Sequence, residues 1–156
     1  IRDRNPVEAL TELAPVIDAI HTKYTDITNE NIGIGSTIFA VKPGDGSARE
    51  QAASCQKVLG GWANIANEYA TKRYRSNLIN WGMLPFLIEK GDLPFTNGDY
   101  IFLPDVRKAV EAKASEFEAY VVKDGSLIPF VLKMGELTDD EREIILKGCL
   151  INYNRQ

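Results

Sequence analysis

A serine and an arginine stand two residues apart in a glycine-rich stretch between an expected strand and an expected helix. Ser47 follows Gly46, and Ala48 and Arg49 come next. Backbone N–H groups at a helix start are unpaired and carry partial positive charge, so this stretch is suited to an anion. Arg49 adds a planar cation that fits a carboxylate or phosphate, and Ser47 adds a hydroxyl. An alternative stays open, in which Ser47 only caps the helix and Arg49 pairs with a surface acid.

The elements that must position this stretch form a βαβ unit. The sequence predicts a strand over residues 36–41, a helix from 47 to about 59 and a second strand over 62–66. The first strand is apolar on both faces, and we expect it to be buried on both. Glycines 33 and 35 precede this strand instead of following it, which excludes a dinucleotide-binding fingerprint.

The rest of the chain alternates between helical and strand patterns. Asn5-Pro6 predicts the start of a helix that Pro15 should kink or break, and Thr138 with Glu141 predicts a capping box that opens a closing helix to about residue 151. Between them the patterns predict a helix over 71–81, a strand over 83–88 with Pro85 at an edge or end, a strand over 100–103, a helix over 105–114, and strands over 116–122 and 126–132 joined by a tight Asp-Gly turn. The sequence therefore predicts an α/β fold with a mostly parallel sheet, flanking helices and a β-hairpin.

Composition limits the function classes. The chain has 156 residues, 44% of them hydrophobic, and a net charge of −4, which predicts a single domain over residues 1–156 and argues against a surface built for nucleic acid. No apolar run is long enough to span a bilayer. Cys55 and Cys149 lie far apart and favour a reducing, cytoplasmic location; with a single histidine they fall short of a metal site. The chain opens without Met, and we expect it to be a piece of a longer protein.

Other conspicuous residues have structural interpretations. We expect Trp62 and Trp81 to pack in the core, Cys55 to be a small buried thiol, and His21 to be a surface or capping residue. Residues 72–75 contain two arginines and a lysine, which we interpret as a solvated helix face, although contact with an acidic substrate or a neighbouring domain stays open.

Three stretches resemble the mobile swivel domain of aconitases and isopropylmalate isomerases. Residues 44–53, Gly-Asp-Gly-Ser-Ala-Arg-Glu-Gln-Ala-Ala, resemble the family signature Gly-Ser-Ser-Arg-Glu-His-Ala-Ala. Residues 75–78 and 82–86 are similar to the family's Arg-Ser-Asn-Leu and Gly-Val-Leu-Pro-Leu run, and residues 145–153 resemble its closing helix. The resemblance implies a swivelling three-layer domain from the C-terminal end of an aconitase-like hydratase.

The resemblance also implies a reaction and a partner. Family enzymes hydrate or isomerise hydroxy-di- and tricarboxylic acids with a [4Fe–4S] cluster that a separate large domain, or a large subunit, holds through three cysteines. By resemblance, Ser47 is the catalytic base that removes a proton next to a carboxylate, Arg49 clamps that carboxylate, and Gly46 and Ala48 belong to the substrate site. A serine alkoxide is too basic to exist unaided, so it needs N–H donors and a cation beside it. The isolated chain, which holds no metal of its own in this interpretation, should be inactive.

The chain departs from the signature at two positions, and one of them, Ala48, favours an alternative. Ala48 replaces the second serine and Gln51 replaces the histidine, so specificity or activity can differ from that of true aconitase. The alternative is a non-catalytic relative that keeps an anion site, for example for RNA. The net charge of −4 argues against RNA, because RNA binding rests on a basic surface.

Overall fold

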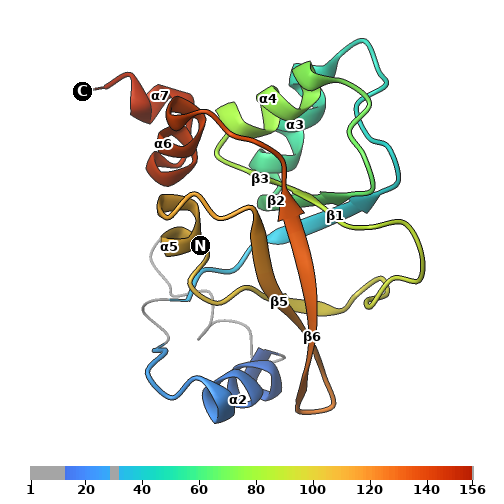
Figure 1. The fold of residues 1–156 in the computed structure, drawn as a ribbon, viewed down its shortest axis with the longest axis vertical. Coiled ribbons are helices and arrows are strands. Elements are labelled where there is room, and N and C mark those ends of the chain that lie inside the picture. The colour runs from blue at the N-terminus through green and yellow to red at the C-terminus, as the bar shows by residue number, and fades with distance from the viewer. Residues whose placement is uncertain (1–12, 29–31, 156) are drawn as a thin grey trace. The chain divides into compact units, whose positions relative to one another are not determined.

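The structure is a computed structural model that describes residues 13–28 and 32–155. The predicted helix start at Asn5-Pro6 lies outside the described residues. The first described helix, α2, spans Ala14–Lys23 and has Pro15 in its first turn, where the missing N–H of proline costs no hydrogen bond. Pro15 thus lies at the start of α2, and Figure 1 shows α2 in blue.

Six strands form a mixed sheet in the order β1-β2-β3-β6-β5-β4. β1, β2 and β3 pair in parallel, whereas β3 with β6 and β4 with β5 pair antiparallel. The strands are β1 Ser36–Ala40, β2 Gly61–Ala66, β3 Leu84–Leu87, β4 Tyr100–Phe102, β5 Glu116–Lys123 and β6 Ser126–Met134. The predicted α/β three-layer fold with flanking helices is confirmed, and the parallel part of the sheet is confined to its first three strands.

The helices begin and end where local signals are strong. They are α3 Arg49–Val58, α4 Lys72–Asn80, α5 Val106–Glu111, α6 Asp139–Lys147 and α7 Leu150–Tyr153, in addition to α2. The predicted capping box at Thr138 is present. The single closing helix that we predicted is divided into α6 and α7, because Gly148 adopts φ +89° and ends α6 in a left-handed C-cap.

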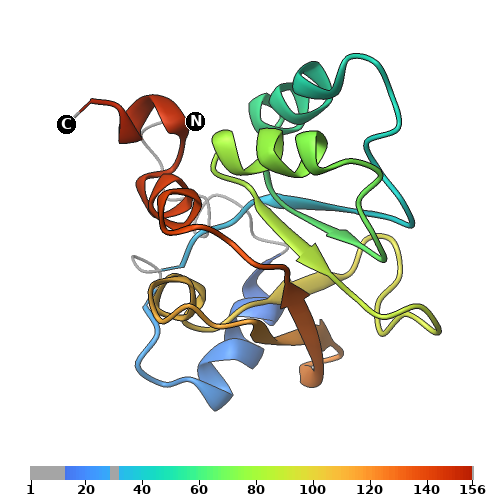
Figure 2. The same cartoon turned by 45° about the horizontal axis from the view of Figure 1, so that its top comes forward.

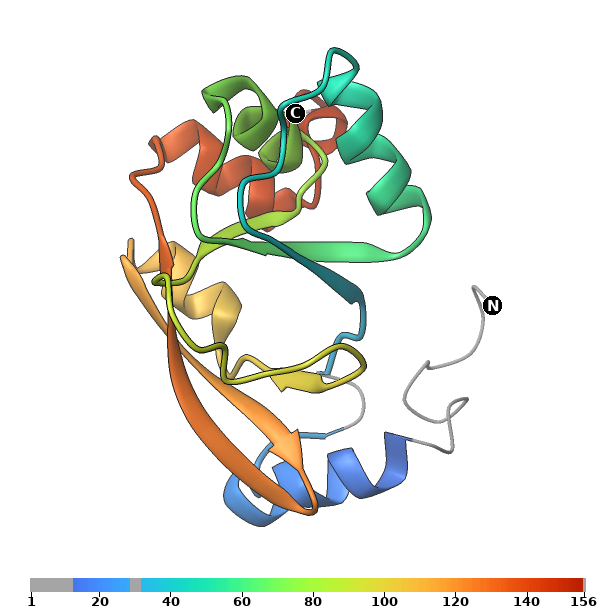
Figure 3. The ribbon, with the colours of Figure 1, turned by 90° about the vertical axis from the view of Figure 1, so that its right-hand side faces the viewer.

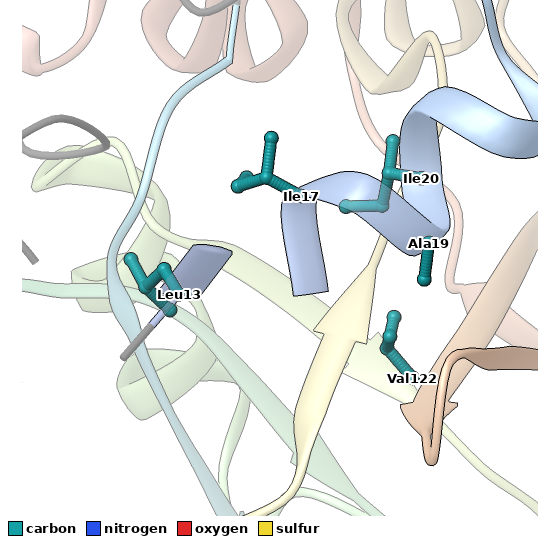
Figure 4. Packing of buried hydrophobic residues seen from close by; sticks show 5 residues of the cluster. All are labelled: Leu13, Ile17, Ala19, Ile20 and Val122. Carbon is teal, nitrogen blue, oxygen red and sulfur yellow. The ribbon is translucent and has the colours of Figure 1, made fainter. Parts of the chain in front are cut away.

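The chain forms two compact units, of which the first comprises residues 1–34, 92–104 and 118–130. In its described part, α2 packs Ile17, Ala19 and Ile20 against Val122 of β5 (Figure 4). The β-hairpin of β5 and β6 turns at Asp124 and Gly125, which both have positive φ, as the predicted Asp-Gly turn requires.

The second unit comprises residues 35–91, 105–117 and 131–156. Within it, α3 and α4 lie side by side (Figure 2), on one face of β1, β2 and β3 (Figure 3). Their contact is filled by a buried cluster of Ala53, Tyr74, Leu78 and Met83. This packing fixes α3 on the sheet and thereby places the stretch that contains Ser47.

Three burial predictions are wrong. β1 is the first strand in the sheet order, and its residues Ser36, Thr37 and Ile38 are exposed, so it is not buried on both faces. Trp62, next to this strand, is 48% exposed and is no core residue. Cys55 lies on the outer side of α3 as an exposed free thiol.

Trp81, the second tryptophan, is half-buried and packs against the cluster of α3 and α4. Its indole N–H donates a hydrogen bond to Glu50 Oε1 at 3.0 Å. The prediction that Trp81 packs in the core therefore holds only in part.

Candidate functional site

The carboxyl ends of the three parallel strands meet at one edge of the sheet. Ala40 of β1 is level with Ala66 of β2, which is level with Leu87 of β3. In open α/β sheets, ligands bind outside this edge. The loops that leave it are residues 41–48 and 67–71 and the segment after residue 87, and the first of them contains Ser47.

The first half of the 41–48 loop is attached to the 67–71 loop. Glu68 N–H donates to the Val41 carbonyl at 3.1 Å, and Ala70 N–H donates to the Pro43 carbonyl at 2.9 Å. Lys42 Nζ lies 2.7 Å from a carboxylate oxygen of Glu68. These contacts hold the start of the 41–48 loop in place, a few residues before Ser47.

The second half of the loop faces solvent. Gly46, Ser47 and Ala48 are all exposed, and a Cβ placed at Gly46 would find no atom within 4 Å. The N-cap of α3 is Ala48, and no side chain forms a cap hydrogen bond there. Ser47 therefore does not cap the helix, and no hydrogen bond joins its hydroxyl to another residue in the part of the chain that the structure describes.

Arg49 is the first residue of α3 and is half-buried. Its Nε is buried and has no hydrogen-bond partner, and among the described residues no acid forms an ion pair with its guanidinium. The neighbouring acid, Glu50, already accepts the hydrogen bond from Trp81. The pairing of Arg49 with a surface acid is thus absent, and a buried donor without an acceptor is costly unless a ligand supplies one.

The structure brings the four predicted site residues together at one helix start. Ser47 and Arg49 flank Ala48 at an uncapped end of α3, with open space over Gly46. This arrangement offers free backbone N–H groups, a guanidinium and a hydroxyl, which together can bind a carboxylate.

The basic residues of α4 do not join this site as a group. Lys72 and Arg73 are exposed, as predicted for a solvated face. Arg75 is half-buried; its guanidinium donates to the Glu136 carbonyl at 2.9 Å and lies 3.9 Å from a carboxylate oxygen of Glu141. Arg75 therefore ties α4 to the start of α6.

Sequence reasoning missed one contributor to the architecture of the site, the buried Tyr74 of α4, against which Gly44 packs. The sequence predicted the helix that contains Tyr74, but no local signal could have shown that this residue contacts the 41–48 loop. His21 lies in α2, in the first unit, and its Nε2 is buried without a partner.

The described residues do not fit a [4Fe–4S] cluster or another metal. Among them, no group of three or more His, Cys, Asp or Glu side chains is placed to hold a metal ion. The thiols of Cys55 and Cys149 are both free. No described helix has the length and apolar character that a membrane span requires.

Part of the chain matches a family of known proteins. Residues 21–91 match the model of the aconitase C-terminal domain, and no match to a curated protein was found. The matched range includes β1, α3, β2, α4 and β3, and thus the whole 41–48 loop. The match over residues 21–91 therefore supports an aconitase-like C-terminal swivel domain.

Proposed function

We propose that this chain is the substrate-binding swivel domain of an aconitase-like hydratase or isomerase that acts on hydroxy-di- and tricarboxylic acids. The observation that carries the proposal is that the side chain of Arg49 is half-buried and lacks a partner for its Nε. Arg49 lies in the first turn of an uncapped helix and stands two residues from an exposed serine. A substrate carboxylate would satisfy both Arg49 and the free N–H groups of α3.

In the proposed mechanism, Arg49 holds a carboxylate through charge-assisted hydrogen bonds and thereby orients the adjacent carbon. Ser47 Oγ takes the proton from that carbon, and the electron pair of the broken C–H bond forms a C=C double bond as the hydroxyl group leaves the neighbouring carbon. The cluster assigned below to the large domain would supply the Lewis acid that accepts this hydroxyl group. The positive end of α3 and the guanidinium of Arg49 stabilise the serine alkoxide. Return of water to the double bond completes hydration.

Gly46 and Ala48 shape the substrate site in this proposal. Gly46 leaves open space next to Ser47, so a substrate group can approach the backbone. Ala48 presents a methyl group where the family signature has a serine hydroxyl. We therefore expect a substrate preference that differs from that of true aconitase.

The proposal assigns the [4Fe–4S] cluster to a large partner domain of the same polypeptide, or to a large subunit, because the described residues of this chain do not fit a cluster. The isolated chain should then be inactive. Co-purification from the source cell distinguishes the two arrangements, since a free polypeptide of about this length is present only if the chain is a subunit.

The test is an anaerobic preparation of the full-length protein. Its absorbance and electron paramagnetic resonance spectra are recorded, and citrate, isocitrate and isopropylmalate are assayed. We expect the signature of a cluster together with turnover of a hydroxy-acid. A cluster-loaded protein that turns over none of these acids would contradict the proposal.

Ala48 favours a second candidate, a non-catalytic anion- or RNA-binding relative, because it removes a hydroxyl from the site. RNA binding would fall steeply as salt rises. The test is the affinity for RNA, measured across a salt series. Absence of binding at low salt excludes RNA as the ligand.

A further inference from the structure

One buried tyrosine connects three segments that surround the candidate site. Tyr74 of α4 is 2% exposed. Its hydroxyl accepts hydrogen bonds from Gln56 Nε2 of α3 at 2.9 Å and from Asn64 Nδ2 of β2 at 3.1 Å. The tyrosine hydroxyl therefore joins α3 to the sheet through two side-chain amides.

The ring of Tyr74 also lies directly against the 41–48 loop. A Cβ placed at Gly44 would be 2.5 Å from Cγ of Tyr74, and Gly44 has φ +98°. Only glycine tolerates both the close approach and this backbone conformation. The loop thus rests on the tyrosine ring three residues before Ser47.

The hydrogen bond to Gln56 acts on the same face of α3 that carries Arg49. Gln56 is seven residues after Arg49, which is two helical turns, so the two side chains lie on one side of the helix. Ala53, between them, is fully buried against α4. A shift of α3 at Gln56 would therefore be passed along a rigid helix to Arg49.

This buried polar cluster lowers the stability of the fold. Asn64 is 1% exposed, and Asn64 Oδ1 and Gln56 Oε1 are buried without partners. Buried polar groups that are only partly satisfied cost stability, but their directional bonds select one packing arrangement over others. An apolar residue at position 74 would fill the same space without fixing α3 relative to β2.

We propose that Tyr74 is a positioning residue for Ser47 and Arg49: its ring supports the loop, and its hydroxyl holds α3 in register with the sheet. The consequence for turnover rests on the proposed function, whereas the placement of α3 does not. The matching control is Tyr69, a half-buried tyrosine packed against the same cluster. Its hydroxyl donates to the Phe86 carbonyl at 2.9 Å and to the Asn64 carbonyl at 3.4 Å, and in the described part of the chain it forms no hydrogen bond with α3 or with the 41–48 loop.

The experiment compares Tyr74→Phe with Tyr69→Phe in the full-length enzyme, at a temperature at which both are folded. For Tyr74→Phe we expect kcat to fall by about 10-fold to 100-fold and KM to rise, because misplacement by about 1 Å can cost this much. Tyr69→Phe should leave both within about twofold of the wild type, as expected of a residue outside the reacting constellation.

Hydrogen exchange supplies a readout that does not need activity. The amides of residues 52–56 in α3 are compared with those of residues 142–146 in α6. In Tyr74→Phe the α3 amides should exchange at least about tenfold faster relative to α6, whereas a general loss of stability accelerates both helices alike. Gln56→Met, which removes one of the two amides, should show a smaller change of the same kind.

The outcomes separate the two proposals. Selective exchange in α3 without turnover in any variant, the wild type included, supports the positioning role and removes the proposed function. Equal effects of Tyr74→Phe and Tyr69→Phe on exchange and kinetics overturn the positioning role. Should Tyr74→Phe fail to fold, unchanged α3 exchange in Gln56→Met overturns it as well.

Discussion

Two helix starts in the second unit, those of α6 and α3, are built in opposite ways. At α6, Thr138 Oγ1 accepts from the Glu141 N–H at 3.2 Å, and the Thr138 N–H donates to Glu141 Oε1 at 3.3 Å. At α3, the cap position is Ala48, no side chain binds the free N–H groups, and the first residue is Arg49. One helix end is closed by its own side chains, and the other is open.

The difference has an energetic cost, since a side-chain N-cap stabilises a helix by about 1 kcal/mol relative to alanine. α3 forgoes this stabilisation although Ser47, a preferred capping residue, is adjacent to the cap position. Helix ends that keep their N–H groups free are suited to anions. The comparison thus indicates that α6 is built for stability and that the start of α3 is available for a ligand.

The largest expected effect comes from Ser47. In the full-length enzyme, Ser47→Ala should lower kcat by about 10³-fold or more, since a general base contributes about 10²- to 10⁴-fold and this serine is proposed as the only base. Binding of the hydroxy-acid should be largely retained. Ser54→Ala is the matched control, because Ser54 lies in the helix that follows Ser47 and its hydroxyl only donates to the Gln51 carbonyl. Steady-state kinetics of the two variants test this prediction. Normal turnover in Ser47→Ala would show that Ser47 is not the catalytic base.

Arg49 is expected to have the next largest effect. Hydrogen bonds to charged groups contribute about 1.5–3 kcal/mol, so Arg49→Gln should raise KM by about 10- to 100-fold. Arg49→Lys should recover only part of this loss, because an ammonium cannot form the bidentate bond of a guanidinium. Arg73→Gln, at an exposed arginine of α4, is the control for a change in net charge. An equal KM in Arg49→Gln and Arg73→Gln would show that Arg49 does not bind substrate.

A cap introduced at α3 tests the comparison directly. Ala48→Asp should stabilise the free protein by about 0.5–1 kcal/mol through capping and the helix dipole, and should weaken binding of the anionic substrate. Ala48→Asn provides a similar cap without the charge and should weaken binding less. Thermal unfolding and substrate titration give both quantities. If Ala48→Asp binds the acid as tightly as the wild type, the open helix end is not the substrate site.

The reverse change at α6 should affect stability alone. Thr138→Ala removes the capping box and should cost about 1 kcal/mol, or about 2–4 °C in Tm. Turnover at a temperature well below Tm should be unchanged. A loss of turnover as large as that in Arg49→Gln would mean that the two helix starts do not have separate roles.

The smallest effect is expected from the exposed ion pair beside the loop. The hydrogen bond from Lys42 and the charge of Lys42 lower the pKa of Glu68, and the same hydrogen bond and the charge of Glu68 raise the pKa of Lys42. Because the pKa of Glu68 is lowered, the stabilisation is present above the ordinary pKa of a carboxyl group and is lost as the pH falls through the lowered value. Lys42→Met should therefore reduce stability less than Thr138→Ala does at neutral pH, and not at all at pH values where Glu68 is protonated. If Lys42→Met is still less stable than the wild type in strong acid, this account is contradicted.

The elements that sequence reasoning predicted well are those with local causes. Thr138 with Glu141 marks a helix start, and Asp124 with Gly125 marks a hairpin turn, because each signal acts within four residues. The β1–α3–β2 unit followed from two short apolar runs with a glycine-rich turn and a helix start between them. The four candidate site residues lie within that unit, so their neighbourhood was predictable.

The features that escaped prediction depend on contacts distant in sequence. β1 lies at the sheet edge because it pairs with β2 alone, whereas the later strand β6, more than forty residues away in register, pairs with β3. Ile38 of β1 is 41% exposed. Trp62 lies at an irregularity in the β1–β2 register, where Ser36 pairs with Gly61 and Thr37 with Ala63. That Ala48, instead of Ser47, occupies the cap position is a shift of one residue, which boundary signals do not resolve.

A crystal structure of the full-length enzyme with bound citrate tests the central claim most directly. The account predicts a citrate carboxylate within hydrogen-bond distance of the Arg49 guanidinium and of Ser47 Oγ, at the open start of α3. A citrate bound elsewhere, with Arg49 and Ser47 untouched, would contradict it.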